Sequence, residues 1–184
     1  MRTNSRSSVF TALFAALIAA GSLIAIPIGP IPIVFQNAFA ILAGLLLGPL
    51  QGAGAVGLFL LAGVLGLPVF SGGKSGIAAI SGPTGGYLIG YFIGALVAGY
   101  SLEKATAENR PRLAAVTAAA IGGFLAIYVP GVVALKNKLD LSLADAILKG
   151  FVPFVIADFV KIAVLVPITL KLRPIVQRYL RPDA

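Results

Sequence analysis

A chain of 184 residues that is 59% hydrophobic and only 11% charged is not an ordinary soluble domain, in which about a quarter of the residues are charged. Its lack of Cys and His excludes disulfides, haem, Cys/His metal sites and His acid–base catalysis. In so apolar a chain, with mean hydropathy +1.02, a net charge of +8 more often reflects membrane orientation than nucleic-acid binding.

The first predicted membrane span covers residues 9–26 and follows a short polar segment with Arg2 and Arg6. Such a start also resembles a secretory signal that would be cleaved near 19–21, although the first span of a bundle looks the same. Ala12, Ala16 and Ala20 recur every four residues, which makes a flat stripe of small side chains. The stripe could pack inside the bundle or form a docking face for another subunit.

Two further spans are predicted at 34–48 and 50–65, after a proline-rich connection at 27–32. Proline removes backbone donors and disfavours helix in the residue before it, so this connection is expected to be extended. The adjacent amides Gln36 and Asn37 stand at the mouth of the second span. They either satisfy free backbone groups there or contact a ligand.

A glycine-rich segment at 66–82 follows, with Lys74 as its one charge. Gly72-Gly73-Lys74-Ser75 suggests a phosphate loop, but that motif requires Gly where Pro68 stands, and no strand precedes it. We therefore reject nucleotide binding here. Many glycines allow backbone to approach a ligand closely, so the segment is expected to fold over one.

The remaining spans are predicted at 83–100, 113–134 and 147–170, separated by charged or polar loops. Thr84 can cap the start of the fourth span, and Tyr87, one turn further, suits a membrane interface. Six spans place both termini on one side. That side carries nine of the 14 Lys and Arg residues and the opposite side four, so both termini are predicted to be cytoplasmic. The expected fold is all-α: one membrane domain, 1–184, forming a six-helix bundle with both ends inside.

Asp158 and Lys161 lie within the last span, where a charge costs about 2.5 to 3.5 kcal/mol. Their i, i+3 spacing places them on one helix face. They either neutralise each other or line a polar pocket that receives a ligand. Asp158 is the one carboxylate in a span, and no Ser in a span lies near Lys161, so hydrolytic chemistry is not expected. A small-molecule-binding membrane protein remains, not an enzyme.

Several motifs in this order resemble BioY, the family of biotin-specific substrate-binding (S) components of energy-coupling factor (ECF) vitamin transporters. The resemblance covers nearly the whole chain. Its motifs are Pro30-Ile31-Pro32-Ile33-Val34-Phe35-Gln36, Leu42-Ala43-Gly44-Leu45-Leu46-Leu47-Gly48, Gly66-Leu67-Pro68-Val69-Phe70-Ser71-Gly72-Gly73, Gly82-Pro83-Thr84-Gly85-Gly86-Tyr87-Leu88 and Asp158-Phe159-Val160-Lys161. Val34, Asn37 and Lys74 depart from the family pattern, which more often has Thr, Thr and Gly there.

The resemblance implies high-affinity capture and uptake of biotin at the cytoplasmic membrane, with no cofactor or metal in this chain. It implies a transmembrane T component and two cytoplasmic ATPases as partners, with the stripe Ala12, Ala16 and Ala20 facing the T component. A solitary biotin transporter and a scaffold with a structural Asp–Lys pair are the alternatives. The implied biotin-binding residues are Asp158, Lys161, Gln36, Asn37, Phe70, Ser71, Gly72, Gly73, Thr84, Gly85 and Tyr87.

Overall fold

The structure, a computed structural model, describes residues 5–27, 31–105 and 112–180. Within these ranges it contains eight α-helices and one small antiparallel sheet. The elements are α1 (Ser5–Ala20), β1 (Ala25–Ile26), β2 (Ile33–Val34), α2 (Gln36–Leu47), α3 (Pro49–Val64), α4 (Gly76–Ile80), α5 (Gly85–Ala105), α6 (Leu113–Lys138), α7 (Leu143–Gly150) and α8 (Val152–Leu180).

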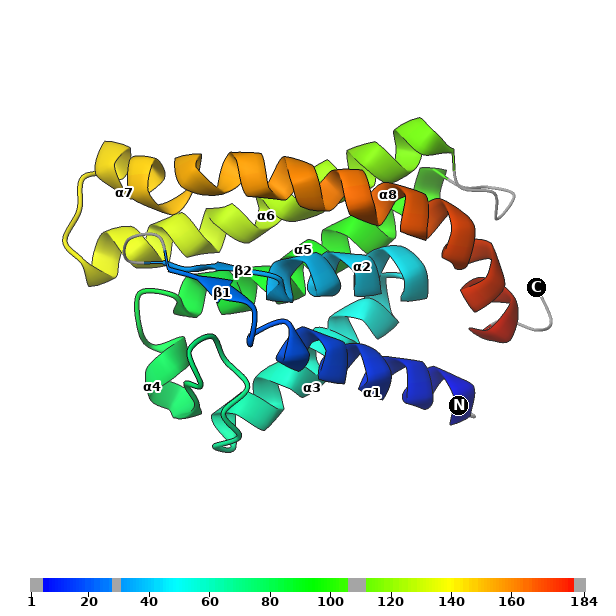
Figure 1. Cartoon of the computed structure of the whole chain (residues 1–184), viewed down its shortest axis with the longest axis horizontal. Coiled ribbons are helices and arrows are strands. Elements are labelled where there is room, and N and C mark those ends of the chain that lie inside the picture. Colours follow the sequence, from blue (N-terminus) through cyan, green and yellow to red (C-terminus); the bar gives the residue numbers. More distant parts are fainter. Residues whose placement is uncertain (1–4, 28–30, 106–111, 181–184) are drawn as a thin grey trace.

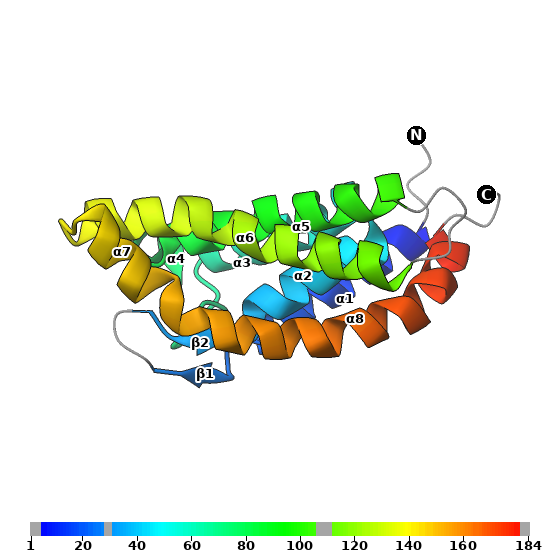
Figure 2. The ribbon, with the colours of Figure 1, turned by 90° about the horizontal axis from the view of Figure 1, so that it is seen from above.

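The long helices run roughly along one axis, which gives the molecule two distinct ends (Figure 1). The start of α1 and the end of α8 lie at one end, whereas α4, α7 and the β1–β2 pair lie at the other. The view turned by 90° shows the same separation (Figure 2). This arrangement brings the irregular segments around α4 and the strands together at the end away from the termini.

Three segments are long and apolar enough to cross a membrane: Gly85–Ala105, Leu113–Lys138 and Leu143–Leu180, which comprises α7 and α8. The helices α1, α2 and α3 are apolar but shorter. With 12 residues, α2 spans about 18 Å, less than the roughly 30 Å of a bilayer core. Every residue of α2 except Phe39 is buried, so this helix is surrounded by protein instead of lipid.

Some boundaries differ from those expected from the sequence. The first helix ends at Ala20, and Ala25 pairs with Val34 in the strand pair, so α2 begins only at Gln36. The last segment begins at Leu143, where the Ser142 hydroxyl accepts a hydrogen bond from the Asp145 backbone N–H at 3.1 Å. Residues 28–30 of the proline-rich connection and Arg2, Arg110 and Arg181 of the charge count lie outside the described residues.

Glycines bring α5 and α6 unusually close together. Gly86, Gly90 and Gly94 are four residues apart and all buried on the same face of α5. A Cβ atom at these positions would lie 2.2, 2.5 and 2.7 Å from backbone oxygens of α6, at Pro130, Ile127 and Gly123. Only glycine permits this approach, which suits helix association by close packing in a bilayer.

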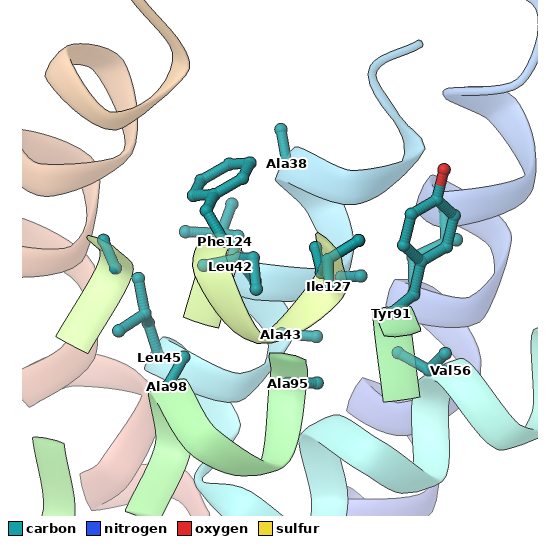
Figure 3. Close-up of a cluster of buried hydrophobic side chains, with 14 of the residues drawn as sticks. Ala38, Leu42, Ala43, Leu45, Val56, Tyr91, Ala95, Ala98, Phe124 and Ile127 are labelled. Carbon is teal, nitrogen blue, oxygen red and sulfur yellow. The ribbon is translucent and has the colours of Figure 1, made fainter. Parts of the chain in front are cut away.

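The apolar core forms where α2 meets its neighbours. Figure 3 shows Leu42 and Leu45 of α2 among side chains of α3, α5 and α6, including Val56, Ala95 and Ile127. At the far end of α2, the Arg173 guanidinium of α8 donates to the Leu45 carbonyl, and Gln177 Nε2 donates to the Leu46 carbonyl at 2.7 Å. These carbonyls end a helix and have no partner within it, so the two side chains satisfy them.

Candidate functional site

A polar cluster joins α2, α6 and α8 inside the protein. Lys161 Nζ lies 3.1 Å from Asp158 Oδ1 and donates a hydrogen bond to Asn37 Oδ1 at 2.9 Å. Asn37 Nδ2 in turn donates to Asp158 Oδ1 at 3.3 Å, and the Tyr128 hydroxyl donates to Asp158 Oδ2. The first residues of α2 thus meet the first half of α8 and the second half of α6.

Burial makes each of these contacts necessary. Asp158 and Lys161 are each 5% exposed and Asn37 is 7% exposed, so water cannot replace a missing partner. Removing both charges from water is costly, and only close pairing with further hydrogen bonds offsets that cost. The i, i+3 spacing read from the sequence does produce an ion pair. Asn37 and Tyr128 complete its hydrogen bonding.

A cavity of about 80 Å³ lies next to this cluster. Its lining includes residues of α4 and of the start of α5, and both elements lie at the end of the molecule away from the termini (Figure 1). Six of the residues selected from the sequence line the cavity: Gln36, Asn37, Phe70, Ser71, Thr84 and Tyr87. They come from the start of α2, the segment between α3 and α5, and the start of α5. The other lining residues are Ile31, Pro32, Val34, Lys74, Ala79, Leu88, Tyr91, Ile127, Tyr128 and Phe154.

The other five selected residues do not line this cavity. Asp158 and Lys161 lie next to Asn37, and Asp158 instead borders a largely apolar hollow of about 140 Å³ between α6 and α8. Gly72 and Gly73 are exposed in a turn, with φ of +74° and +70°. Gly85 is buried at the start of α5, where a Cβ atom would lie 1.6 Å from the Ile80 carbonyl oxygen.

The segment between α3 and α4 covers one side of the cavity. Its Phe70 is 2% exposed and packs edge-on against Phe59 of α3, with ring centroids 5.4 Å apart. Gln36 Nε2 of α2 donates to the Val69 carbonyl at 3.0 Å, which ties the segment to the cavity floor. The glycine-rich segment thus lies over the cavity, held by one aromatic contact and one side-chain hydrogen bond.

Sequence reasoning missed Tyr91 and Tyr128 as site residues. Both are buried and line the cavity. Tyr91 lies one helical turn after Tyr87, on the same face, and this spacing was visible in the sequence. A phenol far inside an apolar span, such as Tyr128, also needs a hydrogen-bond partner, which points to a polar site nearby.

The described residues contain no group of three or more His, Cys, Asp or Glu side chains that could hold a metal ion. The polar groups that line the cavity are amides, hydroxyls and one exposed ammonium, and the buried ion pair lies behind Asn37 and Tyr128. Such groups recognise a small organic molecule by hydrogen bonds and charge, within mostly apolar walls.

Long apolar helices, a buried ion pair and a cavity at one end define a helical integral membrane protein with a small-molecule site. The model of the BioY family matches residues 1–178. The chain therefore belongs to the BioY family.

Relatives with the name BioY match almost the whole chain. Biotin transporter BioY of Thermotoga maritima is 39% identical over 168 residues, covering 91% of this chain and 96% of that protein. Probable biotin transporter BioY of Pyrococcus horikoshii is 38% identical, covering 88% of this chain and 93% of the relative. The crystal structure of the S-component for biotin from an ECF-type ABC transporter matches with a TM-score of 0.83 at 31% identity, covering 94% of each chain.

Proposed function

We propose that the chain is the S component of an ECF transporter, which captures biotin at the cytoplasmic membrane and takes it into the cell. Family membership carries this proposal, together with a 31% identical solved S component for biotin that has the same fold over 94% of this chain. A separate T component and two ATPases supply the energy, since the chain has no phosphate loop of its own.

The cavity offers partners for every polar atom of the biotin ureido ring, which has two N–H donors and one carbonyl acceptor. Asn37 uses one Nδ2 hydrogen on Asp158, which leaves the second to donate to the ureido carbonyl. The Tyr128 oxygen and the Gln36 amide oxygen are acceptors for the ureido N–H groups. Tyr87 and Phe70 supply apolar surface for the fused rings.

In this arrangement Asp158 and Lys161 belong to the binding site as the pair that orients Asn37 and Tyr128. Ser71 and Thr84 add hydroxyls at the cavity wall. Gly72 and Gly73 form the turn of the covering segment, and Gly85 lets this segment pack on the start of α5. The proposed site therefore keeps all eleven residues, of which six line the cavity and five do not.

A calorimetric titration of the purified protein with biotin in lipid nanodiscs tests the function. We expect saturable binding of one biotin per chain. Ligand at 1,000 times its Kd should also stabilise the folded protein by about 4 kcal/mol, visible as a higher melting temperature. If biotin produced no heat of binding and no thermal stabilisation, the proposal would be contradicted. That result would favour a scaffold whose ion pair is only structural.

We further propose one domain with six membrane-crossing segments, namely α1, α2, α3, α5, α6 and the α7–α8 pair, and with both termini in the cytoplasm. The distribution of Lys and Arg supports this orientation. Because the chain has no Cys, single-cysteine variants report sidedness. Ser75→Cys should react with an impermeant maleimide in intact cells and Ser101→Cys only after lysis. The reverse pattern would overturn the orientation.

Ala12, Ala16 and Ala20 support a partner surface on α1. All three are exposed, whereas Ala15 between them is buried. The stripe therefore faces away from the bundle, and it is a flat surface on which another membrane helix can pack closely. We propose that the T component occupies it.

A further inference from the structure

Lys74 is the one charged residue among those that line the cavity in the described part of the chain. It closes a tight turn, in which the Phe70 backbone N–H donates to the Lys74 carbonyl at 3.0 Å. Gly72 and Gly73 make the turn with positive φ angles of +74° and +70°, which glycine adopts without strain. Because Phe70 is buried, this pairing fixes the backbone of Lys74 next to the cavity.

The position of Lys74 is at the mouth of the cavity. A second, more open hollow of about 350 Å³ lies outside it, lined by residues of α4 and its flanks. Lys74, Ala79 and Thr84 line both the inner cavity and this outer hollow. A molecule that extends from one to the other must pass these three residues.

The two ends of the cavity differ in charge. Behind Asn37 and Tyr128 at the inner end, Asp158 and Lys161, which do not line the cavity, neutralise each other across 3.1 Å. At the mouth, the exposed Lys74 ammonium forms no ion pair or hydrogen bond with any residue that the structure describes. The site as a whole therefore presents neutral donors and acceptors inside and one uncompensated positive charge outside.

We propose that Lys74 binds the carboxylate of the ligand and so sets its orientation. Biotin has a neutral ureido head and an anionic tail, which match the neutral inner end and the cationic mouth. The head lies against Asn37 and Tyr128, and the tail points outward to Lys74. This inference rests on the proposed function, because it takes biotin as the ligand.

Binding of biotin and of biotinamide, which has the same head and a neutral tail, tests the role of Lys74. In the wild-type protein biotin should bind about tenfold more tightly than biotinamide, because a hydrogen bond to a charged group contributes about 1.5 to 3 kcal/mol and exposure reduces it. Lys74→Gln should lower the affinity for biotin about tenfold and leave the affinity for biotinamide unchanged. Lys74→Arg should keep the preference.

Lys149→Gln is the matched control. Lys149 is exposed on α7, at the same end of the molecule, and does not line the cavity, so removing its charge should change neither affinity. Higher salt should weaken biotin binding to the wild type but not to Lys74→Gln, since exposed charges are screened. If the wild type binds biotin and Lys74→Gln keeps the full preference for biotin over biotinamide, Lys74 does not bind the carboxylate. If the wild type binds neither compound, the proposed function itself is wrong.

Discussion

Lys161 Nζ donates a hydrogen bond to Asn37 Oδ1 at 2.9 Å, although the two residues are 124 positions apart in the sequence. The same helix, α8, contacts the other end of α2 through Arg173 and Gln177. Polar contacts with α8 therefore hold α2 at both ends, one beside the cavity and one toward the termini. The Asn37 amide lines the cavity, and its contacts with the ion pair hold it in a fixed position.

Asp158→Asn should abolish high-affinity biotin binding and destabilise the protein. It leaves the buried Lys161 ammonium without its counter-ion, a change that costs about 3 to 5 kcal/mol. Asn37 and Tyr128 donate to different oxygens of Asp158, and an Asn side chain has only one acceptor oxygen, so one of the two donors loses its acceptor. Thermal unfolding and biotin titration in nanodiscs measure the two effects. Asp145→Asn, on the exposed surface of α7, is the control and should leave binding unchanged.

The double variant Asp158→Asn/Lys161→Met separates stability from binding. Replacing both members of a buried pair by neutral side chains is often nearly neutral for stability. We expect the double variant to recover much of the melting temperature but not biotin binding. Recovery of both would mean that the pair is only structural and that biotin binding does not depend on it.

Much of the site was predictable because its chemistry is local in the sequence. Two charges inside an apolar span already indicate a polar site, and their i, i+3 spacing predicts the ion pair that forms. Paired amides at the mouth of a span indicated Gln36 and Asn37. Apolar runs in the sequence located the long helices. The helices themselves can be longer or shorter than the apolar runs that predicted them.

The sequence could not show which groups meet across the fold. Asn37 lies between the ion pair and the cavity, and nothing in the sequence around Asp158 or Lys161 indicates this. The early end of α1 is also a tertiary effect, since Ala25 and Ile26 are apolar enough for a span but pair with β2 instead. Pairing between strands depends on a partner segment, which local hydrophobicity does not reveal.

Gln36→Met should speed the release of biotin. The Gln36 side chain holds the covering segment through the Val69 carbonyl, and Met has a similar size but cannot donate this hydrogen bond. Losing about 1.4 kcal/mol of this contact would raise the dissociation rate about tenfold, and loss of the amide oxygen that we propose as an acceptor for a ureido N–H adds to this effect. Stopped-flow exchange of a fluorescent biotin measures it. Gln51→Met on α3 is the control, because the Gln51 side-chain oxygen has no hydrogen-bond partner among the described residues. Equal rates for both variants would contradict a tethering role.

Gly63→Ala should weaken the packing of the covering segment, which lies between α3 and α4, against α3. A Cβ atom at Gly63 would lie 2.1 Å from the ring of Phe70, so that ring must leave its place against Phe59. Overpacking of this kind costs about 1 to 3 kcal/mol. Gly57→Ala on the same helix is the matched control, since the nearest atom would be 3.7 Å away. We expect weaker biotin binding and faster proteolysis near Phe70 in the first variant alone. Wild-type affinity in Gly63→Ala would show that Phe70 does not shape the site.

Ala16→Trp should block assembly with the T component and leave biotin binding intact. Ala16 is exposed in the middle of the stripe on α1, so an indole there fits the monomer but prevents close approach of another helix. Co-purification with the T component and the ATPases measures assembly, and titration measures biotin binding. Val129→Trp is the control, because Val129 is 69% exposed on α6, away from the stripe. Normal assembly of Ala16→Trp would place the partner on another face. Loss of biotin binding would instead mean that α1 supports the site directly.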